Sequence, residues 1–474
     1  MSRNERAERQ QQFDDMKHTI RKCEGLLEVI SLAFLYYVIW RICYNDAGFY
    51  SYFGNGKYVL IGVYALLTFI LFLYCDSFKY GYLKLGDVVI SQWISMSIVN
   101  FITYFQLCLM ANKMINALPM FLVCVVDYFL TFLLTFIFTA IYHHFYIPRR
   151  MLMIYGNENA ITLKVKMDSR SDKYRIVKLL PIELGYEKIR DEIGHYDAVV
   201  INDVPAQIRN DILKYCYKNG IRIYVTPKLS DIITRGADDI NLFDTPLLLV
   251  KSRGMSLEQR LEKRAMDIIL CMLVLILTTP IMLSVAIAIK LEDGGPVFYR
   301  QKRVTKDGAV FDILKFRSMI VNAEKEGKSI PATDHDPRIT KVGKVIRATR
   351  IDELPQLLNI LSGSMSLVGP RPERVEHVEK YVQEIPEFEY RNKVKGGLTG
   401  FAQIYGKYNT NAYDKLRLDL MYIENYSLLL DIKLILMTIR IVFKPESTEG
   451  FDKVIDIEKL KKTMISAEDT GQKE

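Results

Sequence analysis

The chain has 474 residues, half of them hydrophobic, and a formal net charge of +8. This length corresponds to about three domains at roughly 100–200 residues each. The apolar residues come in long blocks, which excludes a disordered chain and argues against a wholly soluble enzyme. The mild positive charge lacks the dense basic patch of a nucleic-acid-binding protein, so we expect no nucleic-acid partner. The seven cysteines form no C-x-x-C motif, which indicates free thiols in a reducing compartment.

A charged N-terminal tail, residues 1–25, lacks the apolar region of a signal peptide. Four apolar blocks follow, each long enough, or nearly so, to cross a hydrocarbon core of about 30 Å. They cover residues 26–44, 58–75, 88–111 and 117–142. We therefore predict a four-helix transmembrane bundle over residues 26–144. Basic residues gather in the tail, in the second linker and after the fourth block, so both ends of the bundle are expected in the cytoplasm.

Asp127 is an ionisable residue inside the fourth block. It either makes a polar contact within the bundle or between subunits, or it lies near a helix end and contacts water. The sequence leaves both arrangements open.

Residues 145–250 have the pattern of a cytoplasmic α/β module. Short apolar runs with polar edges lie at 151–157, 197–203 and 222–227, and an amphipathic segment closed by Gly220 lies between the last two. The turn after the first run lacks the G-x-G-x-x-G pattern that brings backbone amides to a pyrophosphate. We predict a Rossmann-like module without an intact cofactor site, which serves regulation or assembly.

A fifth apolar block, residues 268–289, contains no charged side chain and is long enough to span a membrane. After four crossings, a fifth would place the remaining Arg- and Lys-rich chain outside the cell, against the positive-inside rule. Pro280 breaks a backbone hydrogen bond within the block, and nearby hydroxyls such as that of Thr279 can satisfy the freed carbonyls. We therefore predict a re-entrant membrane helix at 266–291, with a kinked spanning helix as the alternative.

From Lys263 onward the sequence is dense in distinctive motifs. They are KRAMDIIL, GGPVFYRQKRV, FDILKFRSM, DPRITKVGKVIR, RIDELPQLLNILSGSMSLVGPRPE, GLTGFAQIYG and YIENYSLLLDIKLIL. In this order they resemble the bacterial sugar transferases, or polyprenyl-phosphate glycosyl-1-phosphate transferases. The spans and α/β module ahead of them are similar to long-form members. The resemblance implies a mostly α, monotopic phosphoglycosyl transferase domain at 263–450, which contains the re-entrant helix. A linker at 251–262 precedes this domain, and a charged tail at 451–474 follows it.

Asp352 and Glu353 form an adjacent acidic pair among arginines. Phosphoryl transfer needs a nucleophile, a divalent metal and positive charge near the phosphate oxygens. An aspartate can act as the nucleophile and form an acyl phosphate, and the resemblance implies this role for Asp352. Glu353 is then a metal ligand or a proton-handling partner. We expect the pair to hold Mg²⁺, which suits carboxylate and phosphate oxygens.

Charged residues of the neighbouring motifs are candidates for binding the substrate, because guanidinium groups contact phosphates in a bidentate manner. They are Arg317, Arg338, Arg347, Arg350, Arg371 and Glu373. We expect two of the five arginines to touch the substrate, while any one of them could instead form a structural salt bridge. Glu373 either orients Arg371 or contributes to the metal site. Lys263 and Arg264, at the membrane edge, attract the lipid phosphate or anchor the chain to anionic headgroups.

Two positions depart from the family pattern. Thr305 stands where the family usually has glycine after Q-x-R-V, and Gly396 stands where it has proline in K-P-G-L-T-G. Loss of the proline is expected to loosen that turn. Neither position is expected to touch the acidic pair, so activity should persist while sugar selectivity could change.

The resemblance implies transfer of sugar-1-phosphate from a UDP-sugar to polyprenyl (undecaprenyl) phosphate, through a covalent aspartyl-phosphosugar intermediate. Such a reaction initiates a capsule, an exopolysaccharide or a similar glycan. It implies a homodimer among membrane lipids in the bacterial inner membrane, with the catalytic domain on the cytoplasmic face. One alternative is a membrane nucleotide-sugar dehydratase or epimerase, which needs the missing glycine-rich turn. The other is a non-catalytic scaffold, which has no use for Asp352 and Glu353 among arginines.

Overall fold

The computed structural model describes residues 3–44, 56–146, 148–157, 159–242, 244–250, 254–321, 323, 336–406 and 410–442. The tail expected at 451–474 and residues 251–253 of the expected linker lie outside this part of the chain. The chain divides into two compact units, with the boundary between Thr226 and Pro227. The N-terminal unit contains a helical bundle and a parallel sheet, and the C-terminal unit contains the acidic pair.

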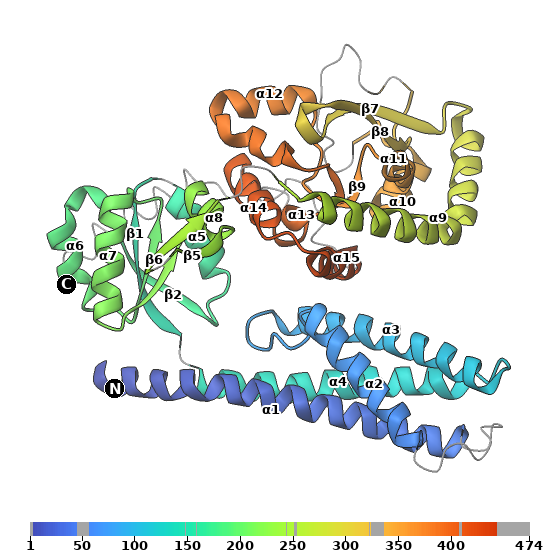
Figure 1. Ribbon diagram of the computed structural model, residues 1–474, viewed down its shortest axis with the longest axis horizontal. Helices are drawn as coiled ribbons and strands as arrows, with labels where there is room; N and C mark the ends of the chain where they lie inside the picture. The colour runs from blue at the N-terminus through green and yellow to red at the C-terminus, as the bar shows by residue number, and fades with distance from the viewer. Residues whose placement is uncertain are drawn as a thin grey trace. The chain divides into compact units, whose positions relative to one another are not determined.

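Four long helices form the first part of the N-terminal unit (Figure 1). They are α1 (Arg3–Cys43), α2 (Gly56–Tyr74), α3 (Leu85–Ala111) and α4 (Leu118–Phe145). Each contains a segment long and apolar enough to cross a membrane, so the chain is a multi-pass membrane protein. The expected tail at 1–25 is helical from residue 3 and continues into the first span. It is rich in Arg, Glu and Gln, which are strong helix formers.

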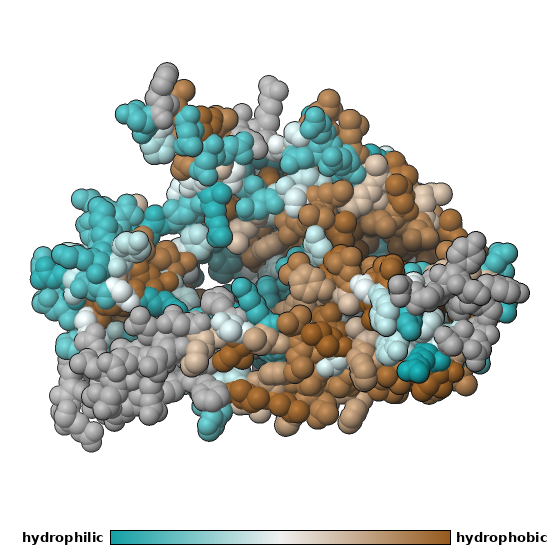
Figure 2. Space-filling model, turned by 60° about the horizontal axis from the view of Figure 1, so that its bottom comes forward, coloured by the Kyte–Doolittle hydropathy of each residue, from teal (hydrophilic) through white to brown (hydrophobic). Residues whose placement is uncertain are grey.

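Large apolar side chains cover the outer surface of the bundle. Figure 2 shows brown, apolar residues spread over the helices that are turned forward in this view. Phe101, Phe121 and Phe129 expose 65%, 64% and 67% of their surface. In water such a surface would favour aggregation, whereas lipid tails solvate it.

Asp127 lies inside the bundle and is fully buried. Its Oδ2 accepts hydrogen bonds from Asn100 Nδ2 at 2.7 Å and from the Tyr64 hydroxyl at 3.2 Å. The Tyr64 ring also stacks on Tyr36 of α1, with 4.3 Å between centroids. These side chains come from all four helices. Asp127 therefore makes a polar contact within the bundle and does not rely on water at a helix end.

A four-stranded sheet with its helices follows the bundle. Its elements are β1 (Arg149–Tyr155), α5 (Asn159–Asp168), β2 (Tyr174–Pro181), the 3-10 helix η1 (Ile182–Leu184), α6 (Tyr186–Ile193), β3 (Ala198–Asn202), α7 (Ala206–Lys218) and β4 (Arg222–Val225). The strand order is β2-β1-β3-β4, and all neighbouring strands are parallel. The expected parallel α/β unit is therefore confirmed, in the doubly wound order typical of flavodoxin-like folds.

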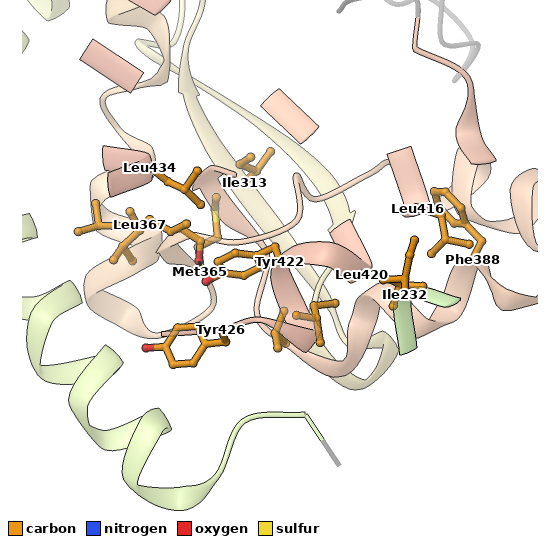
Figure 3. Close-up of a cluster of buried hydrophobic side chains, with 14 of the residues drawn as sticks. Ile232, Ile313, Met365, Leu367, Phe388, Leu416, Leu420, Tyr422, Tyr426 and Leu434 are labelled. Carbon is orange, nitrogen blue, oxygen red and sulfur yellow. Dashed lines mark hydrogen bonds between the residues drawn. The ribbon is translucent and has the colours of Figure 1, made fainter. Parts of the chain in front are cut away.

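The C-terminal unit begins earlier in the chain than the sequence indicates. Three of its elements fall within the range expected for the α/β module, namely α8 (Leu229–Arg235), β5 (Asp238–Leu242) and β6 (Thr245–Leu249). Leu229 and Ile232 of α8 share a hydrophobic core with Leu420 of α14, and Figure 3 shows Ile232 beside Leu420. Because burial of these apolar side chains fixes α8 in the second unit, the boundary follows β4.

The fifth apolar block belongs to α9 (Leu257–Asp293), which contains Pro280 and bends sharply along its length (Figure 1). Proline has no N–H for the carbonyl of Ile276, one turn earlier. The hydroxyl of Thr279 bonds the carbonyl of Leu275 at 2.6 Å and not that of Ile276. The expectation that this hydroxyl satisfies the freed carbonyl was therefore wrong. Back-bonding of this kind still favours a bend, because it draws the carbonyl away from the helix ladder.

The remaining elements of the C-terminal unit are mostly helical, as expected. They are β7 (Phe298–Val304), η2 (Lys306–Gly308), β8 (Val310–Phe316), α10 (Lys341–Ala348), η4 (Ile351–Glu353), α11 (Gln356–Ser362), β9 (Ser366–Val368), α12 (Val375–Glu384), η5 (Pro386–Lys393), β10 (Gly397–Thr399), α13 (Phe401–Tyr405), α14 (Ala412–Glu424) and α15 (Leu428–Val442). Their buried core includes Met365, Tyr422 and Leu434 (Figure 3). This core supports the loops that carry the charged residues described next.

Candidate functional site

The acidic pair, Asp352 and Glu353, lies on the short 3-10 helix η4 between α10 and α11. Arg350 precedes this turn with φ of 57° and ψ of 17°. A side chain with a Cβ rarely adopts this left-handed conformation, which costs free energy and is frequent at functional sites. The conformation of Arg350 fixes the direction in which the chain enters the acidic turn.

Two cations hold the carboxylate of Glu353. Lys315 Nζ lies 2.8 Å from Glu353 Oε1, and Arg371 Nη2 lies 2.7 Å from the same oxygen. Burial raises the pKa of Glu353, but the charges of Arg371 and Lys315 outweigh burial and hold this pKa well below its ordinary value. The charge of Glu353 in turn raises the pKa of Arg371. Glu353 is therefore an anion at neutral pH and orients both cations.

The carboxylate of Asp352 is open by comparison. Within the described chain, no side chain forms a hydrogen bond or an ion pair with it. Burial raises the pKa of Asp352, and the charge of Glu353 acts in the same direction. Lys315, Arg347 and Arg350 oppose this rise with their positive charge, and the net pKa stays above its ordinary value. An open carboxylate among cations is suited to attack a phosphorus atom.

A second group of ion pairs supports the segment that carries Arg371. Arg391 donates to the carbonyl oxygen of Arg371 at 2.9 Å and pairs with Asp419 at 2.8 Å. Arg391 and Asp419 are both buried. Glu373 pairs with Lys415 at 3.3 Å and lies 3.9 Å from Arg391. Through Lys415 and Arg391, Glu373 thus holds this segment in place, which fits a role in orienting Arg371.

Two of the predicted substrate-binding arginines are engaged elsewhere. Arg317 is buried and forms an ion pair with Asp293. Arg338 binds both carboxylate oxygens of Asp336. Neither contacts the acidic pair. The predicted arginines that act on the acidic pair, by contact or by charge, are Arg347, Arg350 and Arg371.

Lys263 and Arg264 bind the protein itself. Lys263 is buried, and its Nζ lies 2.5 Å from the carboxylate of Asp431 on α15. Arg264 donates to the carbonyls of Ile360 and Leu361 in α11 at 2.6 and 2.8 Å. The sequence left open a contact with the lipid phosphate or anchoring to anionic headgroups, whereas in the structure both side chains hold α9 against the core of the C-terminal unit.

Lys315 is absent from the predicted set although it contacts Glu353. It stands two residues before Arg317 in the same K-F-R stretch. Lys315 lies in β8, and strand alternation puts its side chain on the face opposite to that of Phe316, which is only 2% exposed. This alternation was the signal that the sequence offered for a lysine that faces away from the core.

The two departures from the family pattern meet in space. The Thr305 hydroxyl accepts a hydrogen bond from the Gly396 N–H at 3.1 Å and donates to the carbonyl of Ser364 at 3.1 Å. Proline at position 396 would have no N–H, so the threonine supplies the acceptor that a buried glycine amide requires. A Cβ at Gly396 would lie 2.5 Å from Pro372, beside Arg371. The turn packs closely against the Arg371 segment, and the loosening expected from the loss of proline stays a prediction.

The acidic pair could hold a divalent metal together with the substrate. The described residues contain no group of three or more His, Cys, Asp or Glu side chains that could hold a metal ion. Mg²⁺ is commonly held by one or two carboxylates together with substrate phosphates and water. The open oxygens of Asp352 and Oε2 of Glu353 fit this requirement, since Lys315 and Arg371 occupy only Oε1.

The turns at the carboxyl ends of β1 and β3 are the place where the N-terminal unit would bind a dinucleotide. Doubly wound sheets bind ligands beyond the carboxyl ends of their strands, here between β1 and β3. A Cβ at Gly156 would lie 2.4 Å from the carbonyl oxygen of Asp203, and Asn157 Nδ2 binds the Asp203 carboxylate at 3.1 Å. The turn after β1 thus packs closely against the turn after β3 and binds the Asp203 carboxylate, while the glycine-rich pattern that the dehydratase or epimerase alternative needs is missing.

A family model described as bacterial sugar transferase matches residues 258–445. This range contains the acidic pair together with Lys315 and Arg371. It lies entirely within the C-terminal unit.

Curated relatives match the chain over part of their length. A UDP-N-acetylgalactosamine-undecaprenyl-phosphate N-acetylgalactosaminephosphotransferase of Aeromonas hydrophila is 40% identical over 261 residues, which cover 52% of this chain and 59% of that protein. A UDP-glucose:undecaprenyl-phosphate glucose-1-phosphate transferase of Escherichia coli (strain K12) is 44% identical over 209 residues, 43% of each chain. Its namesake from Caulobacter vibrioides is 42% identical over 185 residues, 38% of this chain and 68% of that protein. The chain thus spans about half the length of the first two relatives.

Proposed function

The chain belongs to the bacterial sugar transferase family, and we propose that it transfers sugar-1-phosphate from a UDP-sugar to polyprenyl (undecaprenyl) phosphate. The products are a polyprenyl-diphosphate-sugar and UMP. The reaction is the initiating membrane step of a capsule, an exopolysaccharide or a similar glycan. The observation that carries this proposal is the open carboxylate of Asp352 beside Glu353 and its two cations.

Asp352 is the proposed nucleophile. One oxygen of its carboxylate attacks the phosphorus that bears the sugar, and the bond from this phosphorus to the UMP oxygen breaks. UMP leaves with the electron pair, and the sugar phosphate remains on Asp352 as an acyl phosphate. An oxygen of polyprenyl phosphate then attacks the same phosphorus and displaces the carboxylate. The two displacements predict ping-pong kinetics.

The neighbouring charges stabilise the transition state. Arg371 keeps 38% of its side chain exposed and directs only one nitrogen to Glu353, so other N–H groups can bind phosphate oxygens. Arg347 and Arg350 add positive charge beside Asp352. Mg²⁺, held by the acidic pair, would offset the charge of the diphosphate when bound.

The decisive assay combines purified full-length protein, Mg²⁺, polyprenyl phosphate and a panel of UDP-sugars. We expect sustained UMP release from at least one UDP-sugar, only in the presence of the lipid acceptor, and its loss when a chelator removes Mg²⁺. If no UDP-sugar gives lipid-dependent turnover, the proposed reaction is incorrect.

We infer that α9 enters and leaves the membrane on one side. Near its start, Asp267 accepts the backbone N–H of Leu367 at 3.0 Å. At its end, Asp293 pairs with Arg317. Both contacts lie in the same compact unit, whereas a crossing helix would separate its ends by a hydrocarbon core of about 30 Å. The bend around Pro280 allows the chain to return.

Cysteine labelling tests this topology. Leu261 and Leu291 flank the apolar segment and are 63% and 82% exposed. We expect Leu261→Cys and Leu291→Cys, each in a cysteine-free background, to react with a membrane-impermeant maleimide from the same side of sealed vesicles. Reaction from opposite sides would instead establish the kinked spanning helix.

We further propose that the catalytic unit lies on the cytoplasmic face of the bacterial inner membrane. Positive residues at both ends of the bundle support this orientation. The doubly wound sheet, Rossmann-like in the broad sense, serves regulation or assembly in this proposal.

Homodimerisation is part of the same proposal. Every residue of β5 and β6 is exposed, including Leu242, Leu248 and Leu249 at 53%, 59% and 52%. An isolated two-stranded hairpin is marginally stable and presents open edges. Two-fold pairing with the same hairpin of a second copy would cover these side chains. Mass photometry of the reconstituted protein should give a dimer, and a monomer at all concentrations would contradict this assignment.

A further inference from the structure

A cluster of basic side chains, the basic cluster, surrounds Tyr82 in the segment between α2 and α3. Arg21 of α1 lies over the Tyr82 ring, with Cζ 4.7 Å from the centroid. Lys173, just before β2, lies over the same ring, with Nζ at 4.4 Å. Arg170 donates to the carbonyl oxygen of Tyr82 at 3.0 Å. Three cations from two parts of the N-terminal unit thus meet at one exposed tyrosine.

Lys173 is the most buried cation of this basic cluster. It is 7% exposed, and no carboxylate within the described chain forms an ion pair with it. The neighbouring acid, Asp172, is engaged by Arg170 through two hydrogen bonds of 2.8 Å. Burial, then the charge of Arg170, lowers the pKa of Lys173 to about 8; the charge of Asp172 opposes this effect and that of Arg21 adds to it. A nearly buried ammonium in a positive field favours an anionic partner.

The structure holds Lys173 firmly in this position. The Tyr146 hydroxyl, at the end of α4, donates to the carbonyl oxygen of Lys173 at 3.1 Å. Gly81, next to Tyr82, has φ of 66°, and a Cβ there would lie 2.5 Å from the Tyr142 ring of α4. The close approach of α4 thus requires glycine at this turn. The backbone that carries Lys173 and Tyr82 is therefore held in place, and the basic cluster is not a set of freely moving surface lysines.

The ends of the candidate spans indicate that the basic cluster lies near lipid headgroups. Arg21 stands near the start of the first candidate span, Thr19–Cys43, and Tyr82 stands between the spans at Gly56–Tyr74 and Leu85–Ala111. Tyrosine prefers this interfacial depth, and basic residues there attract anionic lipids. Tyr82 remains 49% exposed, so the membrane side of the basic cluster is accessible.

We propose that Lys173, Arg21 and Arg170 form a binding site for the phosphate of an anionic lipid headgroup, at the junction of the bundle and the α/β module. The phosphate oxygens contact Lys173 Nζ, and Arg21 and Arg170 supply the surrounding positive charge. The lipid is an anionic phospholipid or the polyprenyl phosphate itself. This site is separate from Asp352, and it does not depend on the proposed transfer reaction.

Native mass spectrometry of the full-length protein tests this site. The protein is titrated separately with phosphatidylglycerol, with polyprenyl phosphate and with inorganic phosphate. We expect one lipid to bind the wild type and Lys173→Arg about tenfold more tightly than Lys173→Met, as one charge-assisted contact implies. The lipid with the larger dependence on Lys173 identifies the physiological source of the phosphate.

The matched control is Lys178→Met, which removes the same charge from β2, where Lys178 pairs with Glu192 at 2.8 Å. It should bind lipid as the wild type does. Equal lipid binding by Lys173→Met and Lys178→Met would overturn the proposal, as would binding of inorganic phosphate alone with the same dependence on Lys173. If Lys173→Met fails to fold, Arg21→Met provides the second variant, with weaker lipid binding expected.

Discussion

Replacing Asp352 with asparagine should abolish sugar-phosphate transfer, with a loss of at least about a thousandfold in kcat. The amide keeps the shape of the side chain but cannot form the acyl phosphate. Incubation with a UDP-sugar labelled in the phosphate next to the sugar should label the wild-type protein and leave Asp352→Asn unlabelled. Glu353→Gln is the matched control, because it should slow turnover yet still become labelled. Labelling of Asp352→Asn would assign the nucleophile to another residue.

The pH dependence of the reaction follows from the same geometry. Asp352 attacks as the anion, and its pKa is raised, so kcat/KM should fall as the pH drops through this raised value. Lys315 lowers the pKa of Asp352 through its charge. Lys315→Met should therefore move the acidic limb of the pH profile to higher pH. Lys302→Met, on the exposed face of β7, removes the same charge and should leave the limb unchanged.

Replacing Lys263 with methionine should destabilise the catalytic unit by about 3–5 kcal/mol. The substitution leaves the fully buried carboxylate of Asp431 without its cation. For a unit of this size the melting temperature should fall by roughly 10 °C, which a thermal unfolding scan in detergent measures.

Two further variants separate charge from packing. The double variant Lys263→Met/Asp431→Asn should recover more than half of the lost stability. Its neutral amide oxygen still accepts the hydrogen bond that the Tyr422 hydroxyl donates to Asp431 at 2.8 Å. Lys290→Met, at the exposed end of α9, should change stability by less than about 0.5 kcal/mol. If Lys263→Met unfolds at the wild-type temperature, the buried pair contributes little.

Local patterns made the helices and the acidic pair predictable. The spans follow from the length of each apolar block, and the sheet follows from short apolar runs between polar turns. Asp352 and Glu353 are adjacent in the chain, so their motif is readable without a structure. By contrast, Lys315 and Glu353 are separated by 38 positions, and only the fold brings them together.

Long-range burial explains what the sequence could not reveal. Lys263 has the appearance of a membrane-edge cation, yet its partner Asp431 lies 168 positions later. Leu229 and Ile232 have the appearance of the end of an α/β module, yet their apolar partner Leu420 comes from α14. In each case a side chain with two plausible environments is fixed by a partner that sequence proximity does not identify.

The attachment of both ends of α9 to one unit has a kinetic consequence. On the proposed topology, the catalytic unit cannot leave the bilayer, so it meets its lipid acceptor by lateral diffusion in two dimensions. The effective acceptor concentration is then a surface density. At a fixed amount of polyprenyl phosphate, added neutral lipid should lower this surface density and slow turnover. The rate should still depend on the concentration of the water-soluble UDP-sugar as it does for a reaction in bulk solution.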